Sequence, residues 1–179
     1  LLVGHTPHLR AIPSPTRTLA TTDGLSIRYG STLALRDVAL TVSAGEVVAL
    51  MGRNGAGKST LLNALVGIAP AGSGTVRVNG KDPLALAGPD LLRSVGLVPQ
   101  EPGDLLEATT VAHECRASDR DAGCEAGTTR ALLALMAPDI EDGTHPRDLS
   151  EGQRLLLVLC VILAARPPLL LLDEPTRGL

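Results

Sequence analysis

The chain has 179 residues, which is long enough for one compact domain with its own core. It has no Phe, no Trp and a single Tyr, so aliphatic side chains must fill that core. The formal net charge is −3 and the basic residues form no tract, which argues against a nucleic-acid surface.

The first part of the chain predicts a tail followed by a small sheet. Residues 1–20 carry prolines at positions 7, 13 and 15, and we expect an irregular tail or linker that follows an upstream domain, in a chain that is a fragment. Its apolar start is too short for an export signal. Residues 25–27 then alternate between apolar and polar side chains, and residues 33–42 form a second strand-like stretch. Together they predict a small antiparallel sheet.

Residues 52–60, Gly-Arg-Asn-Gly-Ala-Gly-Lys-Ser-Thr, fit the pattern G-x-x-x-x-G-K-[ST] without a mismatch. They follow residues 46–51, which predict a buried strand, and they precede leucines at helical spacing. In such a loop, backbone N–H groups and the positive end of a helix surround phosphates, Lys58 adds a full charge, and the Ser59 hydroxyl is available to Mg²⁺. The pattern predicts a triphosphate site; a Gly-rich turn beside a surface lysine is the alternative.

The centre of the chain alternates between strands and helices. Residues 75–80 alternate as a strand that ends in a turn, and residues 95–99 form another short buried strand. Residues 101–148 are acidic, with helical patches and little strand signal, and predict a helical insertion. A strand returns at residues 169–172. Strands that alternate with helices around a phosphate loop predict a mostly parallel sheet with helices on both faces.

A long helix is predicted to begin at residue 150. Ser150 and Gln153 satisfy the S-x-x-Q capping box, and Gly152 allows close approach to the helix end. A helix N-terminus with a serine hydroxyl is a second candidate anion site, although capping alone explains the pattern too. The apolar run that follows, residues 155–165, is shorter than the roughly 20 residues of a membrane-spanning helix.

Two carboxylates follow the last predicted strand. Asp173 stands where P-loop ATPases place the residue that organises Mg²⁺. Glu174 is the next residue and a candidate for the base or water-positioning group near the γ-phosphate. Two solvated acids at a strand end are the alternative.

Four motifs follow one another along the chain: the phosphate loop, Val98-Pro99-Gln100, residues 149–153, and residues 169–176. With these motifs, residues 21–179 resemble the nucleotide-binding subunit of ATP-binding cassette (ABC) transporters. The resemblance implies an α/β fold of the P-loop NTPase type, with an antiparallel β subdomain and a helical subdomain inserted at about residues 101–148. That fold would be incomplete at the C-terminus.

The resemblance also implies which residues serve ATP and Mg²⁺. Adenine would stack on Tyr29, the only tyrosine, although a half-buried strand tyrosine is the alternative. Ser59, Gln100 and Asp173 would hold Mg²⁺, and catalysis would involve Glu174, Lys58 and Gln100. The remaining ATP contacts would come from the phosphate loop and the later helix start: Asn54, Gly55, Ala56, Gly57, Lys58, Ser59, Thr60, Ser150, Gly152 and Gln153.

The implied partners are a second ABC ATPase domain and transmembrane transporter subunits. Two such domains pair head to tail, so that residues 149–153 of one would close over the ATP held by the other. The second domain would be identical, different or fused. The assembly would be peripheral, on the cytoplasmic face of the membrane, and we expect no nucleic-acid partner.

Residues 100–106 and 109–114 most resemble energy-coupling-factor ATPases, which power uptake of vitamins or transition-metal ions.

Two features depart from the family. Glu151 replaces the first glycine of Leu-Ser-Gly-Gly-Gln, and we expect it to point to solvent. No histidine follows Asp173, so the family's switch histidine is missing and hydrolysis by this chain alone is left open. The alternatives are a non-transport ABC ATPase of ribosome or DNA maintenance, and a hydrolysis-deficient nucleotide-binding fragment.

Overall fold

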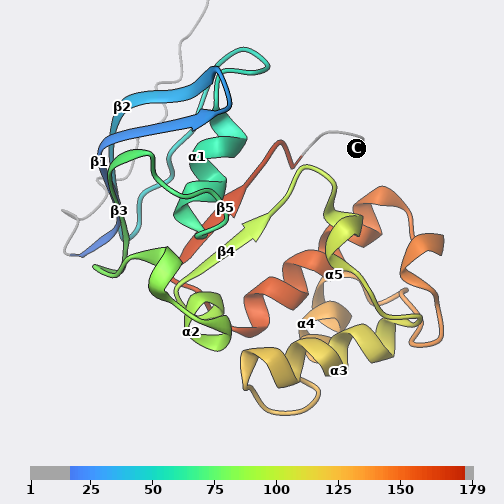
Figure 1. Cartoon of the computed structure of the whole chain (residues 1–179). Coiled ribbons are helices and arrows are strands. Elements are labelled where there is room, and N and C mark those ends of the chain that lie inside the picture. The colour runs from blue at the N-terminus through green and yellow to red at the C-terminus, as the bar shows by residue number, and fades with distance from the viewer. Residues whose placement is uncertain (1–16, 176–179) are drawn as a thin grey trace, which may run out of the picture.

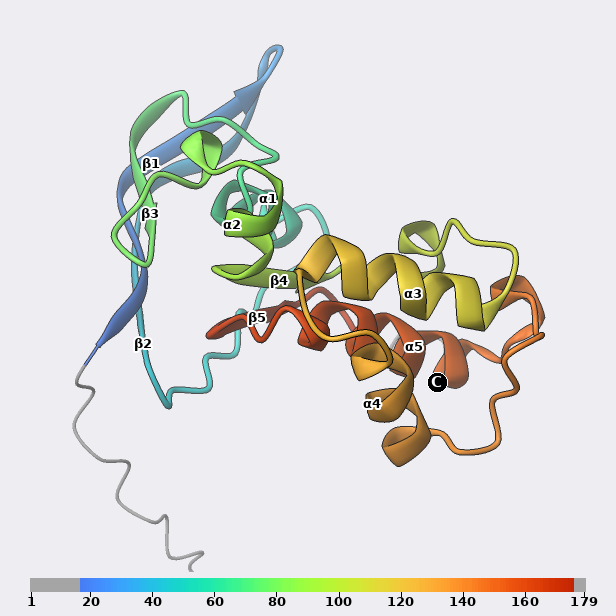
Figure 2. The ribbon, with the colours of Figure 1, turned by 90° about the horizontal axis from the view of Figure 1, so that it is seen from below.

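The structure is a computed structural model that describes residues 17–175. Figure 1 shows an antiparallel sheet, a short parallel sheet beside helix α1, and a cluster of helices α3, α4 and α5. In Figure 2 the antiparallel sheet and the helix cluster lie on opposite sides of the molecule, with the parallel strands between them. Most of the predicted tail, residues 1–16, and Thr176 lie outside the described residues.

The antiparallel sheet has the strand order β2-β1-β3 and contributes one side of the main core. As the alternating pattern predicts, β1 (Thr18–Tyr29) pairs with β2 (Thr32–Ser43) and with β3 (Ser73–Val78). Residues 18–20 therefore form strand rather than the end of the predicted tail. The reason is burial, because Leu19 and Ala20 belong to the main core.

Helix α1 (Lys58–Leu65) begins at the lysine of the phosphate loop, as the motif predicts. It packs on the antiparallel sheet and buries Leu61, Ala64 and Leu65 in the main core. The phosphate loop is thereby attached to a rigid part of the molecule.

The predicted buried strand over residues 46–51 is wrong. The segment forms no ladder, and the exposed fractions of Val47 and Met51 are 98% and 88%. A strand needs a neighbour to pair its backbone N–H and C=O groups. Within residues 17–175 no strand pairs with this segment, and the parallel sheet contains only β4 and β5.

The parallel sheet consists, among the described residues, of β4 (Val95–Val98) and β5 (Leu169–Leu172), and is smaller than predicted. Turn η1 (Pro83–Ala85) and helix α2 (Gly88–Leu92) connect β3 to β4. The first residues of β4 and β5 pair with each other, as do the last, so both strands end at the same edge.

Helices α3 (Val111–Ala122), α4 (Thr128–Met136) and α5 (Glu151–Ala164) pack together, flanked by turns η2 (Pro102–Leu105) and η3 (Pro146–Asp148). None of the helices in the described residues is long and apolar enough to cross a membrane. The cluster has a second core: Val111, Cys115, Leu133, Ala137, Ile140, Leu149, Leu157 and Cys160. Helix α5 contributes to it although it follows the predicted insertion, residues 101–148.

The three cysteines are free thiols. Burial raises the pKa of Cys115 and of Cys160 to about 11. Both thiols are therefore protonated at neutral pH, and they act as small apolar side chains of the second core.

Candidate nucleotide site

A cavity of about 500 Å³ lies where the phosphate loop, the β1–β2 hairpin and the edge of the parallel sheet meet. Its volume suits a nucleotide, because ligand pockets span roughly 300–1,000 Å³. It brings six of the seven predicted phosphate-loop residues together with Gln100 and Glu174, whereas Ala56 is not part of the lining. The lining residues are Thr32, Leu33, Ala34, Asn54, Gly55, Gly57, Lys58, Ser59, Thr60, Gln100 and Glu174.

Lys58 is the only cationic side chain in this lining. Its ammonium group donates hydrogen bonds to the carbonyl oxygens of Gly52 (3.0 Å) and Arg53 (3.3 Å) and lies 3.8 Å from Oε1 of Glu174. Helix α1 begins at the same residue, so the positive end of its dipole faces the cavity too. Both sources of positive potential favour an anionic ligand such as a triphosphate.

Gly57 brings the phosphate loop against the hairpin. Its φ is +91°, and a Cβ at this position would lie 2.5 Å from the carbonyl oxygen of Ala34 and 2.7 Å from Cδ2 of Leu35. Any other residue would push the loop and the hairpin apart. The hairpin residues that line the cavity were not predicted from the sequence, because alternation predicts a hairpin but not where it docks.

Gln100 and Glu174 reach the cavity because each follows one of two paired parallel strands. The backbone N–H of Asp173 donates a 2.9 Å hydrogen bond to the carbonyl oxygen of Val98, which extends the pairing to the end of the sheet. In open α/β sheets, ligands bind at the carboxyl ends of the strands. The distance in sequence between the two residues is therefore no obstacle to a shared site.

Glu174 has a φ of +48°, in the left-handed region that non-glycine residues rarely adopt. Such a backbone conformation costs about 1–3 kcal/mol and is commonest at functional sites. Here the carboxylate of Glu174 lines the cavity, whereas its neighbour Asp173 is buried. The strained turn thus separates two adjacent carboxylates into different environments.

The three residues predicted to hold Mg²⁺ offer the donor atoms that a hard cation prefers. Ser59 and Gln100 line the cavity, and Asp173 lies at the same sheet edge. No cluster of three His, Cys, Asp or Glu side chains suited to a metal occurs within residues 17–175. This donor set fits Mg²⁺, which is usually bound by one or two carboxylates together with substrate phosphates and water.

Tyr29 ends β1, and its exposed fraction is 53%. It pairs with Thr32, which lines the cavity, but its own ring does not. Stacking of Tyr29 on adenine therefore stays a prediction, and it requires the base to extend from the cavity towards the hairpin end.

The capping box predicted at the start of α5 is present. Oγ of Ser150 accepts a hydrogen bond from the N–H of Gln153 (3.2 Å), and Oε1 of Gln153 accepts one from the N–H of Ser150 (3.0 Å). Glu151 is exposed in the first helical turn. Neither the box residues nor Gly152 line the phosphate-loop cavity of their own chain.

The sequence profile of the ABC transporter family matches residues 35–177. The chain belongs to this family and is an ATP-binding domain of it. A putative ABC transporter ATP-binding protein of Streptomyces avermitilis is 63% identical over 94% of the chain, which spans 30% of that relative. The hemin import ATP-binding protein of Streptomyces coelicolor is 38% identical over 93% of the chain, which spans 61% of it.

Solved structures of the family share the fold. A bacterial Atm1-family ABC exporter with ATP bound has a TM-score of 0.74 and 28% identity, covering 99% of this chain and 32% of that one. cbiO1 from Clostridium perfringens, part of the ABC transporter complex cbiONQ, has a TM-score of 0.73 and 29% identity. The match covers 91% of this chain and 68% of cbiO1. The α/β ABC-type fold predicted from the sequence is confirmed.

Proposed function

We propose that the protein binds and hydrolyses ATP to power a membrane transporter. The observation that carries this proposal is the cavity shared by Lys58, Ser59, Gln100 and Glu174. A site for phosphates, candidate ligands for Mg²⁺ and a carboxylate occur together there, and phosphoryl transfer to water uses all three. Family membership supports the coupling of this reaction to transport.

In the proposed reaction, the backbone N–H groups of residues 54–60 and the Lys58 ammonium bind the β- and γ-phosphates. As the phosphates enter, Lys58 exchanges its contacts with two carbonyl oxygens and Glu174 for phosphate oxygens. The Glu174 carboxylate is then free to orient the attacking water and accept its proton. Mg²⁺ held by Ser59, Gln100 and Asp173 would neutralise charge on the phosphates.

We propose that a second ABC ATPase domain completes the site. Ser150, Gly152 and Gln153 lie at a helix N-terminus, where an anion is stabilised, but away from the phosphate loop of their own chain. This arrangement supports their use on the ATP of a partner domain. The partner domain is identical, different or fused.

The proposed transmembrane partner has a candidate docking place. An apolar groove of about 490 Å³ is lined by residues of α1, α2, β4, α3 and α5. Pro99, the neighbour of Gln100, belongs to its lining, so a segment seated there lies one residue from the nucleotide cavity. We propose that a transporter subunit occupies the groove and that the protein lies on the cytoplasmic face of the membrane. Its large apolar residues are Val66, Ile68, Leu91, Leu92, Val95, Leu97, Leu105, Val161 and Ile162.

For the direction of transport we propose uptake of a vitamin or a metal ion. The similarity to a hemin import protein and to a subunit of cbiONQ supports uptake, as do residues 100–106. The Atm1-family exporter has the same fold similarity, so the fold itself does not discriminate between import and export.

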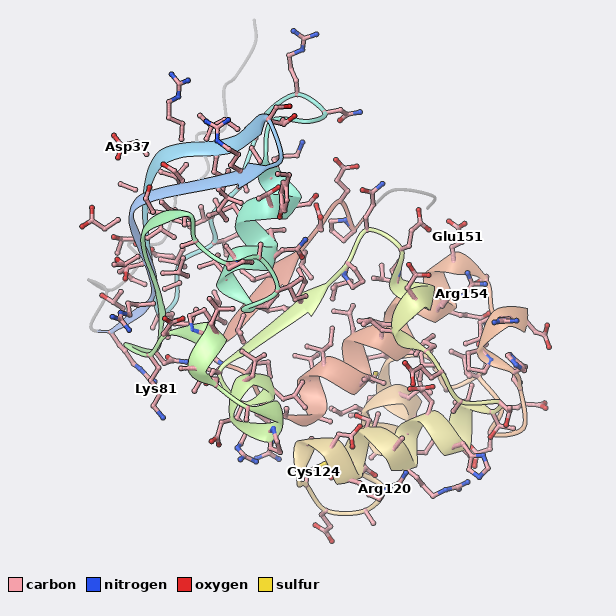
Figure 3. The ribbon with its side chains drawn as sticks, in the orientation of Figure 1. Asp37, Lys81, Arg120, Cys124, Glu151 and Arg154 are labelled. Atoms are coloured by element: carbon pink, nitrogen blue, oxygen red, sulfur yellow. The ribbon has the colours of Figure 1, made fainter. Side chains whose placement is uncertain are left out.

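The test compares Lys58→Ala with Lys81→Ala in the full-length protein. These are the only two lysines of the chain, and Lys81 is exposed and not part of the cavity lining (Figure 3). Loss of a hydrogen bond to a charged group costs roughly 1.5–3 kcal/mol, so Lys58→Ala should weaken MgATP binding by about 10- to 150-fold in calorimetry. Lys81→Ala should bind and turn over ATP as the wild type does. Equal affinity of both variants would contradict the proposed phosphate site.

A further inference from the structure

Arg154 holds the turn that precedes α5. Its Nη2 donates hydrogen bonds to the carbonyl oxygens of Leu149 (2.9 Å) and Arg147 (3.2 Å), and its Nε donates to that of Pro146 (3.4 Å). A guanidinium group has five N–H donors in a rigid plane, so one side chain can hold several carbonyl groups in a set arrangement. The carbonyl groups belong to the turn that ends at Ser150, the cap of α5.

The same side chain packs against turn η2. A Cβ added at Gly103 would lie 2.9 Å from Cδ of Arg154 and 3.6 Å from its Nη1, so the glycine leaves no spare room. The φ of Gly103 is not in the left-handed region, so the close approach, rather than the backbone, favours glycine here. Figure 3 shows Arg154 and Glu151 at the start of α5, beside η2.

Arg154 and Gly103 both line a small cavity that adjoins the nucleotide site. It has a volume of about 120 Å³, and Gln100, Gly103, Arg154 and Glu174 are among its lining residues. Gln100 and Glu174 also line the phosphate-loop cavity. One arginine therefore contacts η2, which begins two residues after Gln100, and the turn that carries Ser150.

We propose that Arg154 is a positioning residue that couples the Gln100 segment to Ser150. Movement of Gln100 towards bound nucleotide shifts η2, and Gly103 pushes or releases the stem of Arg154. Because the guanidinium group is hydrogen-bonded to the 146–149 turn, its displacement moves this turn and the N-terminus of α5. The inference rests on the proposed function, because the position of Ser150 affects turnover only if Ser150 serves a partner's ATP.

The first test removes the guanidinium group and keeps an unbranched stem. In the full-length protein, Arg154→Met should lower kcat for ATP hydrolysis by roughly 2- to 30-fold, the range expected for a residue that carries coupling between sites. The Kd for MgATP of the isolated domain should change less than twofold, because Arg154 does not line the phosphate-loop cavity. Arg154→Lys should recover little of kcat, since an ammonium group lacks the planar fork. The matched control is Arg120→Met, on the exposed side of α3 (Figure 3).

The second test is a double-mutant cycle whose single variant Gly103→Ala keeps Arg154, so that variant remains informative if Arg154→Met folds poorly. Gly103→Ala alone should lower kcat, because its methyl group displaces the Arg154 stem. In an Arg154→Ala background the same change should have no further effect. Additive effects on kcat, or a kcat of Arg154→Met equal to that of Arg120→Met, would overturn the positioning role.

Thermal unfolding and MgATP binding distinguish a coupling role of Arg154 from a purely stabilising role and from failure of the proposed ATP site. If Arg154 serves only stability, kcat of Arg154→Met recovers fully once the assay temperature is lowered below its unfolding transition, which overturns the coupling. If Lys58→Ala binds MgATP normally, the proposed function fails. If Lys58→Ala loses binding while the cycle is additive, only the role of Arg154 fails.

Discussion

Asp119 is a buried carboxylate outside the nucleotide site that joins α3 to α4. Its exposed fraction is 4%, and it accepts hydrogen bonds from the N–H (2.9 Å) and Oγ1 (2.6 Å) of Thr129 and from the N–H of Gly127 (2.7 Å). Burial raises the pKa of Asp119, but these hydrogen bonds outweigh burial and hold the pKa below its ordinary value. The carboxylate therefore stabilises the folded state in its charged form.

We expect Asp119→Asn to lower the free energy of unfolding at pH 7 by about 1–3 kcal/mol, because an amide cannot accept all of these hydrogen bonds. The folded-state pKa lies below the unfolded one, so the contribution of Asp119 is present above the unfolded pKa and is lost as pH falls through the folded pKa. Urea denaturation from pH 7 into acid should show the gap between wild type and variant closing. Asp121→Asn, at an exposed position of α3, is the control; a similar loss there would argue against the buried network.

At the scale of elements, the two helices nearest the proposed ATP sites begin differently. The capping box satisfies two backbone N–H groups at the start of α5. Helix α1 follows Gly57 and has no side-chain cap, so its first N–H groups remain available for a ligand. The uncapped helix thus suits direct phosphate binding, whereas the first turn of α5 already has two of its N–H groups satisfied within its own chain.

Substitutions of Ser150 should separate capping from ATP contact. Ser150→Ala removes the cap and should cost about 1 kcal/mol of stability. Ser150→Asp keeps a capping oxygen and the stability, yet its charge should repel a γ-phosphate, so ATP-dependent pairing of the full-length domains should be lost in light scattering. If Ser150→Asp pairs as well as the wild type does, Ser150 does not face the nucleotide of a partner.

At the scale of the whole molecule, the described residues form two hydrophobic cores. The main core surrounds α1 and the antiparallel sheet, and the second lies between α3, α4 and α5. The phosphate loop leads into α1 of the first core, and the capped start of α5 belongs to the helices of the second. Figure 2 shows the antiparallel sheet and the helix cluster on opposite sides of the parallel strands. Relative movement of the two sides would link nucleotide binding to the partner that we propose for the groove.

Glu174→Gln tests the complete cycle. The amide preserves the shape of Glu174 but cannot accept a proton, so turnover should fall by roughly 10²- to 10⁴-fold while MgATP still binds. Paired domains should then persist with MgATP in size-exclusion chromatography of the full-length protein, whereas wild-type pairs dissociate as ATP is consumed. Glu141→Gln, at an exposed site in the helix cluster, should behave as the wild type does. Normal turnover by Glu174→Gln would remove Glu174 from the reaction.

Local patterns in the sequence were sufficient for several parts of this structure. The phosphate loop, the start of α1 at Lys58 and the capping box at Ser150 depend on neighbours within a few residues, and all three are present. The hairpin of β1 and β2 and the strand β5 also follow from short-range apolar patterns. The sequence by itself determined the phosphate loop, the capping box and the hairpin because their hydrogen bonds and caps close between residues near in sequence, whereas β5 was predictable from its apolar run although it pairs with the distant β4.

Only the tertiary structure decided which segments pair or pack with one another. Residues 46–51 are apolar enough for a strand, but strand formation depends on a pairing neighbour, which local composition does not specify. The same limit applies to the site: the hairpin residues at 32–34, the strained turn at Glu174 and the contact of Arg154 with Gly103 arise from packing between distant segments. The residue types of the candidate site could therefore be predicted from the sequence. Their arrangement in space depends on contacts between segments that are distant in sequence.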